Sequence, residues 1–166
     1  MPVQILLVED NPGDVRLVRE VLLGINDEVR LLVASDGVEA VEFLQRKGRH
    51  IDAPGPDIIL LDLNLPKMYG HGVLAYIKSH SVLRSIPVVV LTSSDAQADI
   101  VKSCHLQASC YLKKPGTLNE FERLIKSFSR FWLTHVTLPG NSWRRLADQQ
   151  ATPNSGGALS LGEKLH

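Results

Sequence analysis

The 166-residue chain has room for one domain of ordinary size, and 44% apolar residues are enough to build a full core. Its 18 basic and 18 acidic residues give a net charge of zero, which argues against a general nucleic-acid or membrane-surface binder. No apolar stretch approaches the ~20 residues that span a bilayer, and the start lacks the regions of a signal peptide. The two cysteines form no disulfide framework, so we expect a reduced, soluble, cytoplasmic protein.

Five short runs rich in apolar and β-branched residues predict buried strands. The most informative is the run of four apolar residues that ends at Asp62, because a run without a polar break is typical of a central parallel strand. We expect strands at Val3–Val8, Val29–Ala34, Ile58–Leu61, Val88–Leu91 and Cys110–Lys113.

Segments with helical periodicity separate these strands. Their expected starts are Pro12, Ser35-Asp36, the residues after Gly70, Asp95 and Leu118. Gly24 is expected to end the first helix, and the second is expected to end near Lys47-Gly48. Val38 in the second helix and the pair Ile100 and Val101 in the fourth are expected to face inward. The last helix, opened by the capping box Thr117-x-x-Glu120, should run from about residue 118 to about residue 134.

Strand and helix thus alternate five times, which predicts an α/β fold. The expected architecture is a flavodoxin-like, doubly wound parallel sheet of five strands in the order 2-1-3-4-5, with helices on both faces. In that order, strands one, three, four and five end side by side, so the chemistry is expected at their carboxyl ends. The residues found there are Glu9, Asp10, Asp62, Thr92 and Lys114.

This set suits phosphoryl transfer. Three carboxylates at one edge repel one another unless a cation neutralises them, and Mg²⁺ prefers oxygen ligands. Lys114 adds a positive charge and Thr92 a hydroxyl, as a transferred phosphoryl group requires. Asp62 is the expected nucleophile, which would form an aspartyl phosphate.

Four pieces of the sequence resemble the receiver domains of bacterial two-component response regulators. They are the acidic pair Glu9-Asp10, the D-x-N-x-P-x-M-x-G run from Asp62 to Gly70, Thr92-Ser93, and Lys114-Pro115. Each piece is weak alone, but together they occur in the right order on the right predicted elements. The resemblance covers about residues 3 to 134.

The resemblance implies that Asp62 accepts a phosphoryl group from a phosphohistidine on a sensor histidine kinase. It also implies that Asp10, Asp62 and the backbone carbonyl of Asn64 bind Mg²⁺ directly and that Glu9 binds it through water. On this reading the protein is not an enzyme but a phosphoacceptor switch with at most slow self-dephosphorylation.

The same resemblance assigns three further roles. Lys114, which precedes a proline, matches the lysine that binds the phosphoryl group, and its bond to Pro115 is expected to be cis. Thr92 matches the hydroxyl that moves toward the phosphoryl group, and Tyr111 the aromatic switch residue that follows it. Simple packing of Tyr111 on its strand is the competing interpretation.

Two other functions remain open from the sequence. One is a Mg²⁺-dependent phosphohydrolase with an aspartyl nucleophile, although Asn64 replaces the general acid that such phosphatases of the haloacid-dehalogenase type carry two residues after the nucleophile. The other is an interaction module that is not phosphorylated.

The receiver domain is expected to span residues 1–138, and a partly disordered extension residues 139–166, whose end is compatible with an expression-tag remnant. This extension is too short for an independent core of ordinary kind, so we expect a stand-alone receiver that signals through protein contacts. The last helix supports such a contact, because Leu124 and Phe131 widen its apolar stripe. We therefore expect a homodimer through Leu124, Phe128 and Phe131; alternatively, these residues only support the tail.

Three short segments narrow the resemblance further. Asn11-Pro12-Gly13-Asp14, together with Phe131-Trp132-Leu133 and Leu138-Pro139, is similar to the small regulators that pair with cyanobacterial phytochrome-type light sensors. A phytochrome-type kinase is therefore the expected partner.

Overall fold

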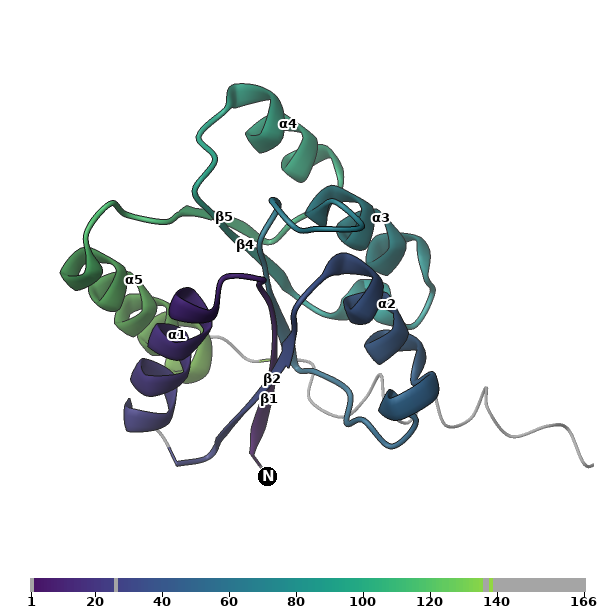
Figure 1. The fold of residues 1–166 in the computed structure, drawn as a ribbon, viewed down its shortest axis with the longest axis horizontal. Coiled ribbons are helices and arrows are strands. Elements are labelled where there is room, and N and C mark those ends of the chain that lie inside the picture. The colour runs from purple at the N-terminus through teal and green to yellow at the C-terminus, as the bar shows by residue number, and fades with distance from the viewer. Residues whose placement is uncertain (1, 26, 136–137, 139–166) are drawn as a thin grey trace, which may run out of the picture.

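The computed structural model describes residues 2–25, 27–135 and 138 and shows a five-stranded parallel sheet between two layers of helices (Figure 1). The strands lie in the order β2-β1-β3-β4-β5, so the predicted fold class and strand order are confirmed. Their bounds are β1 Val3–Val8, β2 Val29–Ala34, β3 Ile58–Leu61, β4 Val88–Thr92 and β5 Cys110–Lys113.

Two helices cover one face of the sheet and the others lie toward the opposite face. Helices α1 and α5 lie side by side, and α2 and α3 pack together across the sheet from them (Figure 1). The bounds are α1 Pro12–Ile25, α2 Gly37–Gln45, α3 Gly70–Ser79, α4 Gln97–His105 and α5 Leu118–Arg130, with 3-10 turns at Gly48–His50 and Leu83–Ser85 and a π-helical turn at Phe131–His135. In the part of the chain described, no helix is both long and apolar enough to cross a membrane.

The alternation of side chains along each strand builds two cores. In β1, Ile5 and Leu7 pack against α1 and α5, whereas Leu6 and Val8 pack against α2 and α3. All residues of β3 are buried completely, as expected of a central strand with helices on both faces. Full burial of one such side chain contributes about 1.5–3 kcal/mol, so burial fixes β3 firmly in the centre of the sheet.

Backbone hydrogen bonds carry the strand ladders past the strand ends and into the loops above them. The Asp62 amide donates to the Val8 carbonyl at 3.0 Å, and the Lys114 amide donates to the Thr92 carbonyl at 2.8 Å. These bonds fix the backbones of Asp62 and Lys114 beside neighbouring strands, at the carboxyl edge of the sheet.

Two predicted helix caps are present. The side chains of Asp36 and Thr117 accept hydrogen bonds from the amides of Glu39 and Glu120, at 2.7 and 3.3 Å. Helix α5 ends at Arg130, and the π-helical turn continues the helical path to His135, close to the expected end.

Some details of the first two helices differ from the sequence predictions. Gly24 does not end α1, which runs on to Ile25. Val38 is 37% exposed rather than inward, because α2 turns Ala40 and Phe43 toward the sheet instead. Helix α2 ends at Gln45, before the expected Lys47-Gly48, because Arg46 takes the left-handed conformation at φ 55° that a glycine was expected to supply.

The prediction for α4 is wrong in its start and in its buried residues. Asp95 is exposed in the preceding loop, and the helix begins at Gln97. Val101 is 43% exposed and Ile100 only half-buried; the buried residue of α4 is Ser103, which lies 3.1 Å from the ring Nε2 of His71 on α3. A buried ring nitrogen needs a polar partner. The residue of α4 that faces His71 is therefore a serine, where apolar residues were expected to face inward.

Gly70 is required by a close approach between α3 and the loop after β3. A Cβ at this position would overlap the carbonyl group of Asp62 and the backbone of Leu63, whereas a Cβ at Gly24 would meet nothing within 4 Å. We expect Gly70→Ala to lower the free energy of unfolding by about 2 to 4 kcal/mol, because the colliding atoms are backbone that cannot rotate away.

Chemical denaturation measures the difference in unfolding free energy between the parent protein and Gly70→Ala, and Gly24→Ala is the matched control. Gly24→Ala should be neutral or stabilising by up to about 1 kcal/mol, because alanine is the better helix former. Equal stabilities of the two variants would contradict the tight contact at Gly70.

Candidate functional site

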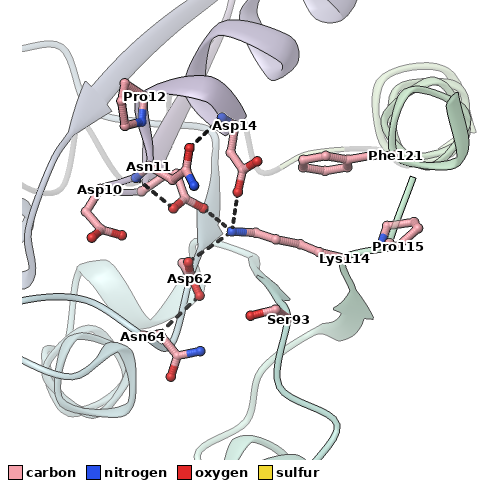
Figure 2. A pocket seen from close by; sticks show the side chains of 12 residues that line it. Asp10, Asn11, Pro12, Asp14, Asp62, Asn64, Ser93, Lys114, Pro115 and Phe121 are labelled. Carbon is pink, nitrogen blue, oxygen red and sulfur yellow. Dashed lines mark hydrogen bonds and ion pairs between the residues drawn. The ribbon is translucent and has the colours of Figure 1, made fainter. Parts of the chain in front are cut away.

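A polar pocket of about 680 Å³ opens at the carboxyl edge of the sheet (Figure 2). Its walls come from the loop after β1 and the start of α1, from the ends of β3 and β4, and from the loop after β5. The residues that line it are Glu9, Asp10, Asn11, Pro12, Asp14, Asp62, Asn64, Ser93, Lys114, Pro115, Gly116 and Phe121.

The three predicted acids meet in this pocket. One carboxylate oxygen from each of Glu9, Asp10 and Asp62 lies within 4.8 Å of those of the other two. Glu9 is 2% exposed and Asp62 5%, whereas Asp10 faces solvent. Strand order alone explains this meeting, because β1 and β3 are adjacent and parallel and end at the same level.

The side chain of Lys114 reaches across the pocket to Asp62, Asp14 and Glu9 (Figure 2). Its ammonium group donates to the carboxylates of Glu9, Asp14 and Asp62, the last two at 2.9 and 3.0 Å. Only 10% of the lysine side chain is exposed, so these ion pairs are screened weakly by solvent. Lys114 therefore joins segments that are 52, 100 and 105 residues away along the chain.

Burial and the ammonium group act in opposite directions on the two buried acids. Burial raises the pKa of Glu9 to about 7, against the hydrogen bond from Lys114. For Asp62, burial also opposes ionisation, but the charge and hydrogen bond of Lys114 outweigh it and hold the pKa below its usual value. The pKa of Lys114 is raised, because its bonds to Glu9 and Asp14 outweigh its own desolvation. Asp62 is thus the buried carboxylate that stays ionised at neutral pH.

The two predicted switch residues, Thr92 on β4 and Tyr111 on β5, are not among the residues that line the pocket. Thr92 is buried completely at the end of β4, and its hydroxyl lies close enough to Asp62 to help lower the pKa of that carboxyl. Tyr111 is half-buried, and its hydroxyl donates to the carbonyl oxygen of Ser94 at 2.7 Å. Tyr111 therefore contacts the loop that begins directly after Thr92.

The loop after β3 folds back on Asp62. The Asn64 amide donates to one oxygen of the Asp62 carboxylate at 3.1 Å, while Lys114 holds the other oxygen. The expectation of a cis bond between Lys114 and Pro115 is wrong for this structure, which has no cis peptide bond among the residues described. The trans bond is the favoured form by about 0.5–1 kcal/mol, and Lys114 makes all three of its ion pairs with it.

The sequence prediction missed Asp14 and Asn11. Asp14 pairs with Lys114, and Asn11 fixes the turn that places Asp14. A signal was present: Asp14 lies in the first turn of a helix that starts four residues after the first strand, and such a turn lies at the same edge as the strand's end. Ser93 belongs to the predicted Thr92-Ser93 piece but was given no role of its own, and Phe121 carried no comparable signal.

The donor set of the pocket fits a divalent cation with a preference for oxygen. Glu9, Asp10 and Asp62 offer three carboxylates, and a single ammonium group does not balance them. Carboxylate oxygens in this number are the ligands that Mg²⁺ and Mn²⁺ use in proteins. Within the described ranges 2–25, 27–135 and 138, no other such group of acids, histidines or cysteines occurs.

Comparison with known proteins gives the family. Residues 5–126 match the model of the response regulator receiver domain. The chain is 46% identical over 138 residues to "Response regulator Rcp1" of Synechocystis sp., with 83% of this chain and 94% of Rcp1 covered. It is 35% identical over 142 residues to the "Probable methanogenesis regulatory protein FilR2" of Methanothrix harundinacea, which covers 84% of this chain and 89% of FilR2.

Solved structures agree with this result. The phosphorylated cyanobacterial phytochrome response regulator RcpA superimposes with a TM-score of 0.81 at 42% identity, covering 84% of this chain and 99% of RcpA. The Mn²⁺-bound form of Rcp1 superimposes with a TM-score of 0.80 at 45% identity, covering 83% and 99%. The chain therefore belongs to the response regulator receiver domains, the phosphorylation-dependent switches of two-component signalling.

Proposed function

We propose that Asp62 is the phosphoacceptor of this receiver and takes its phosphoryl group from a sensor histidine kinase in a Mg²⁺-dependent reaction. The observation that carries the proposal is the ion pair of 3.0 Å between Lys114 and a buried, ionised Asp62, inside a pocket that also contains two further acids. An ionised carboxylate is the nucleophile that such a transfer requires.

In the transfer, an Asp62 oxygen forms a bond to phosphorus while the bond between phosphorus and the kinase histidine breaks. The electron pair of the broken bond stays on the imidazole nitrogen. The Lys114 ammonium, already beside Asp62, offsets the charge on the phosphoryl oxygens.

We assign the cation ligands to Asp10, Asp62 and the backbone carbonyl of Asn64, with Glu9 acting through water. The mutual proximity of the three acids supports this set, as does the Mn²⁺-bound form of the relative Rcp1. When bound, the cation supplies positive charge to the carboxylates and to the phosphoryl oxygens.

We further propose that Thr92 and Tyr111 relay the phosphorylation. Thr92 lies next to Asp62, and the loop after it accepts the hydrogen bond of the Tyr111 hydroxyl at Ser94. A phosphoryl group adds close to two negative charges and three acceptor oxygens, which can draw the Thr92 hydroxyl inward. That movement would shift Ser94 and release Tyr111, and so alter the surface around α4 and β5.

The protein's own chemistry is at most slow self-dephosphorylation. An aspartyl-nucleophile phosphohydrolase needs a general acid near its nucleophile, and the Asn64 side chain cannot serve as one. The zero net charge gives no reason to propose a nucleic-acid partner.

We propose that the kinase is a phytochrome-type light sensor. The support is the similarity to Rcp1 and to RcpA, the second of which is described as a phytochrome response regulator. The bacteriophytochrome response regulator RtBRR also superimposes, with a TM-score of 0.64 at 38% identity, covering 91% of this chain and 94% of RtBRR.

We also propose a homodimer through the last helix. Leu124 is half-buried and Phe131 is 55% exposed, and both line an apolar groove of about 400 Å³ between β5 and α5. Phe128 is almost fully buried and forms the floor of this groove rather than its rim. Leu118, at the start of the same helix, is 68% exposed and lies outside the groove. Residues 139–166, the expected extension, lie outside the described residues.

Asp62→Asn should abolish phosphorylation, because an amide is neither ionised nor nucleophilic at neutral pH. Labelling with acetyl phosphate and with purified histidine kinases, phytochrome-type kinases in darkness and in red light among them, measures the effect. Asp95→Asn is the matched control, since Asp95 is an exposed acid that pairs with Lys113 outside the pocket. Undiminished labelling of Asp62→Asn would exclude Asp62 as the acceptor.

Asp10→Asn should weaken Mg²⁺ binding at least about tenfold, because one of the two carboxylates that bind the cation directly is lost. Isothermal titration calorimetry with Mg²⁺ gives the dissociation constant without any phosphodonor. The Asp95→Asn variant should bind Mg²⁺ like the parent protein. Equal affinities of parent and Asp10→Asn would remove Asp10 from the ligand set.

The double substitution Leu124→Glu/Phe131→Glu should yield monomers under conditions in which the parent is a dimer, because charges would have to be buried in the interface. Light scattering coupled to size-exclusion chromatography measures the mass, with and without acetyl phosphate. Ile51→Glu is the control, as Ile51 is 67% exposed in the loop before β3. A parent protein that is monomeric in both states would refute the dimer.

A further inference from the structure

Lys114 has a third carboxylate partner whose purpose the phosphotransfer chemistry above does not explain. Asp14, in the first turn of α1, accepts a hydrogen bond from the Lys114 ammonium at 2.9 Å (Figure 2). Its side chain is 27% exposed, so it lies at the rim of the pocket, whereas Glu9 and Asp62 lie deeper. The three carboxylates use all three protons of the ammonium group.

Asp14 differs from the other two partners in having no second task. Glu9 and Asp62 belong to the group of acids that could hold a cation, and Asp14 does not. A cation at that group competes with Lys114 for both of these carboxylates. A phosphoryl group on Asp62 also occupies one of its oxygens. Asp14 is then the one of the three partners whose contact with Lys114 is affected neither by cation binding nor by phosphorylation of Asp62.

The local backbone holds Asp14 in place. The Asn11 side-chain oxygen accepts hydrogen bonds from the amides of Gly13 and Asp14, at 2.9 and 3.1 Å. The Asn11 amide in turn donates to the second oxygen of Glu9 at 3.1 Å. One capped turn thus sets the positions of both Glu9 and Asp14 relative to the pocket. An acid in the first turn is also favoured by the helix dipole, so its charged form is stable there.

Lysine needs such a partner. Its ammonium sits at the end of four rotatable bonds, and Lys114 reaches the pocket from the loop after β5, a strand that β3 and β4 separate from β1. Without a fixed anion opposite, many rotamers of this side chain would point away from Asp62. A fixed carboxylate across the pocket reduces that freedom.

We propose that Asp14 is a positioning residue: it holds the Lys114 ammonium across the pocket, so that the charge stays next to the reacting oxygen of Asp62 while a cation and the phosphoryl group engage the other carboxylates. This inference rests on the proposed role of Asp62 as phosphoacceptor. It adds a residue that neither touches the phosphoryl group nor binds the cation.

The first test compares substitutions at position 14. At saturating Mg²⁺, Asp14→Asn should lower the rate constant of phosphorylation by acetyl phosphate about tenfold, because the amide keeps the size of the side chain but loses its charge. Asp14→Glu should recover part of the rate. Mg²⁺ affinity measured by calorimetry should change less than about threefold, and Asp95→Asn should behave as the parent in both assays. An unchanged or faster Asp14→Asn would overturn the proposal, since it would mean that the acid only repels the anionic donor.

A double-mutant cycle shows whether Asp14 acts through Lys114. In a Lys114→Met background, Asp14→Asn should change the remaining rate less than about twofold, because the group it positions is gone. The same tenfold loss in both backgrounds would also overturn the proposal, because it would place the effect of Asp14 elsewhere, for example in the stability of α1.

A third measurement does not depend on phosphorylation. In ¹⁵N-labelled protein with Mg²⁺ and no phosphodonor, the ammonium signal of Lys114 should be resolved in the parent and in Asp95→Asn. It should be broadened beyond detection in Asp14→Asn, where the group exchanges its protons with water more rapidly. If the parent shows this signal but accepts no phosphoryl group on Asp62, the proposed function fails while the anchoring of Lys114 by Asp14 stands. If the signal is equally sharp in Asp14→Asn, the anchor itself is refuted.

Discussion

The ion pairs of Lys114 are the interaction on which the site depends. A single ammonium group joins the end of β1, the first turn of α1 and the end of β3 to the loop after β5. Buried acids so close together cannot all be ionised unless positive charge is near, and Lys114 supplies that charge within the protein. The chain thereby keeps the pKa of Asp62 below its usual value, although burial acts to raise it. The same contact therefore joins the loops at the carboxyl edge of the sheet and keeps the proposed phosphoacceptor ionised.

The sheet makes this contact possible at little cost in conformational freedom. Asp62 and Lys114 lie directly after β3 and β5, and backbone bonds to Val8 and Thr92 extend the ladders to these two residues. The cores on both faces of the sheet consist of fully buried apolar side chains, so the strands do not shift easily. Because the backbone positions are fixed, only the side-chain rotamers remain to be set. The hydrogen bonds of Asn11 and the ion pairs of Lys114 fix the side chains of Glu9, Asp14 and Lys114.

The sequence was sufficient for the strands, their order and the meeting of Glu9, Asp10 and Asp62, because short apolar runs and the alternation of strand and helix determine which strand ends are adjacent. It was not sufficient for contacts that depend on how neighbouring helices pack. Val38 and Val101 have the periodicity of inward residues, yet they lie exposed because Phe43 and Ser103 take the inward positions. Asp14 was missed for another reason: its place in the first turn of α1 put it at the correct edge of the sheet, but nothing in the sequence marked it as a partner of Lys114.

The weak packing of α4 has a bearing on how the proposed switch can work. An apolar stripe buried along α4 would cost several kcal/mol to displace. This helix instead buries Ser103 against His71, and its preceding loop is held to Tyr111 by one hydrogen bond at Ser94. Each such hydrogen bond makes a net contribution of about 0.5–1.5 kcal/mol to stability. In the proposed switch, charge-assisted bonds from the phosphoryl group to Lys114 and Thr92 would be worth more than these, so phosphorylation would rearrange α4 without disturbing the two cores.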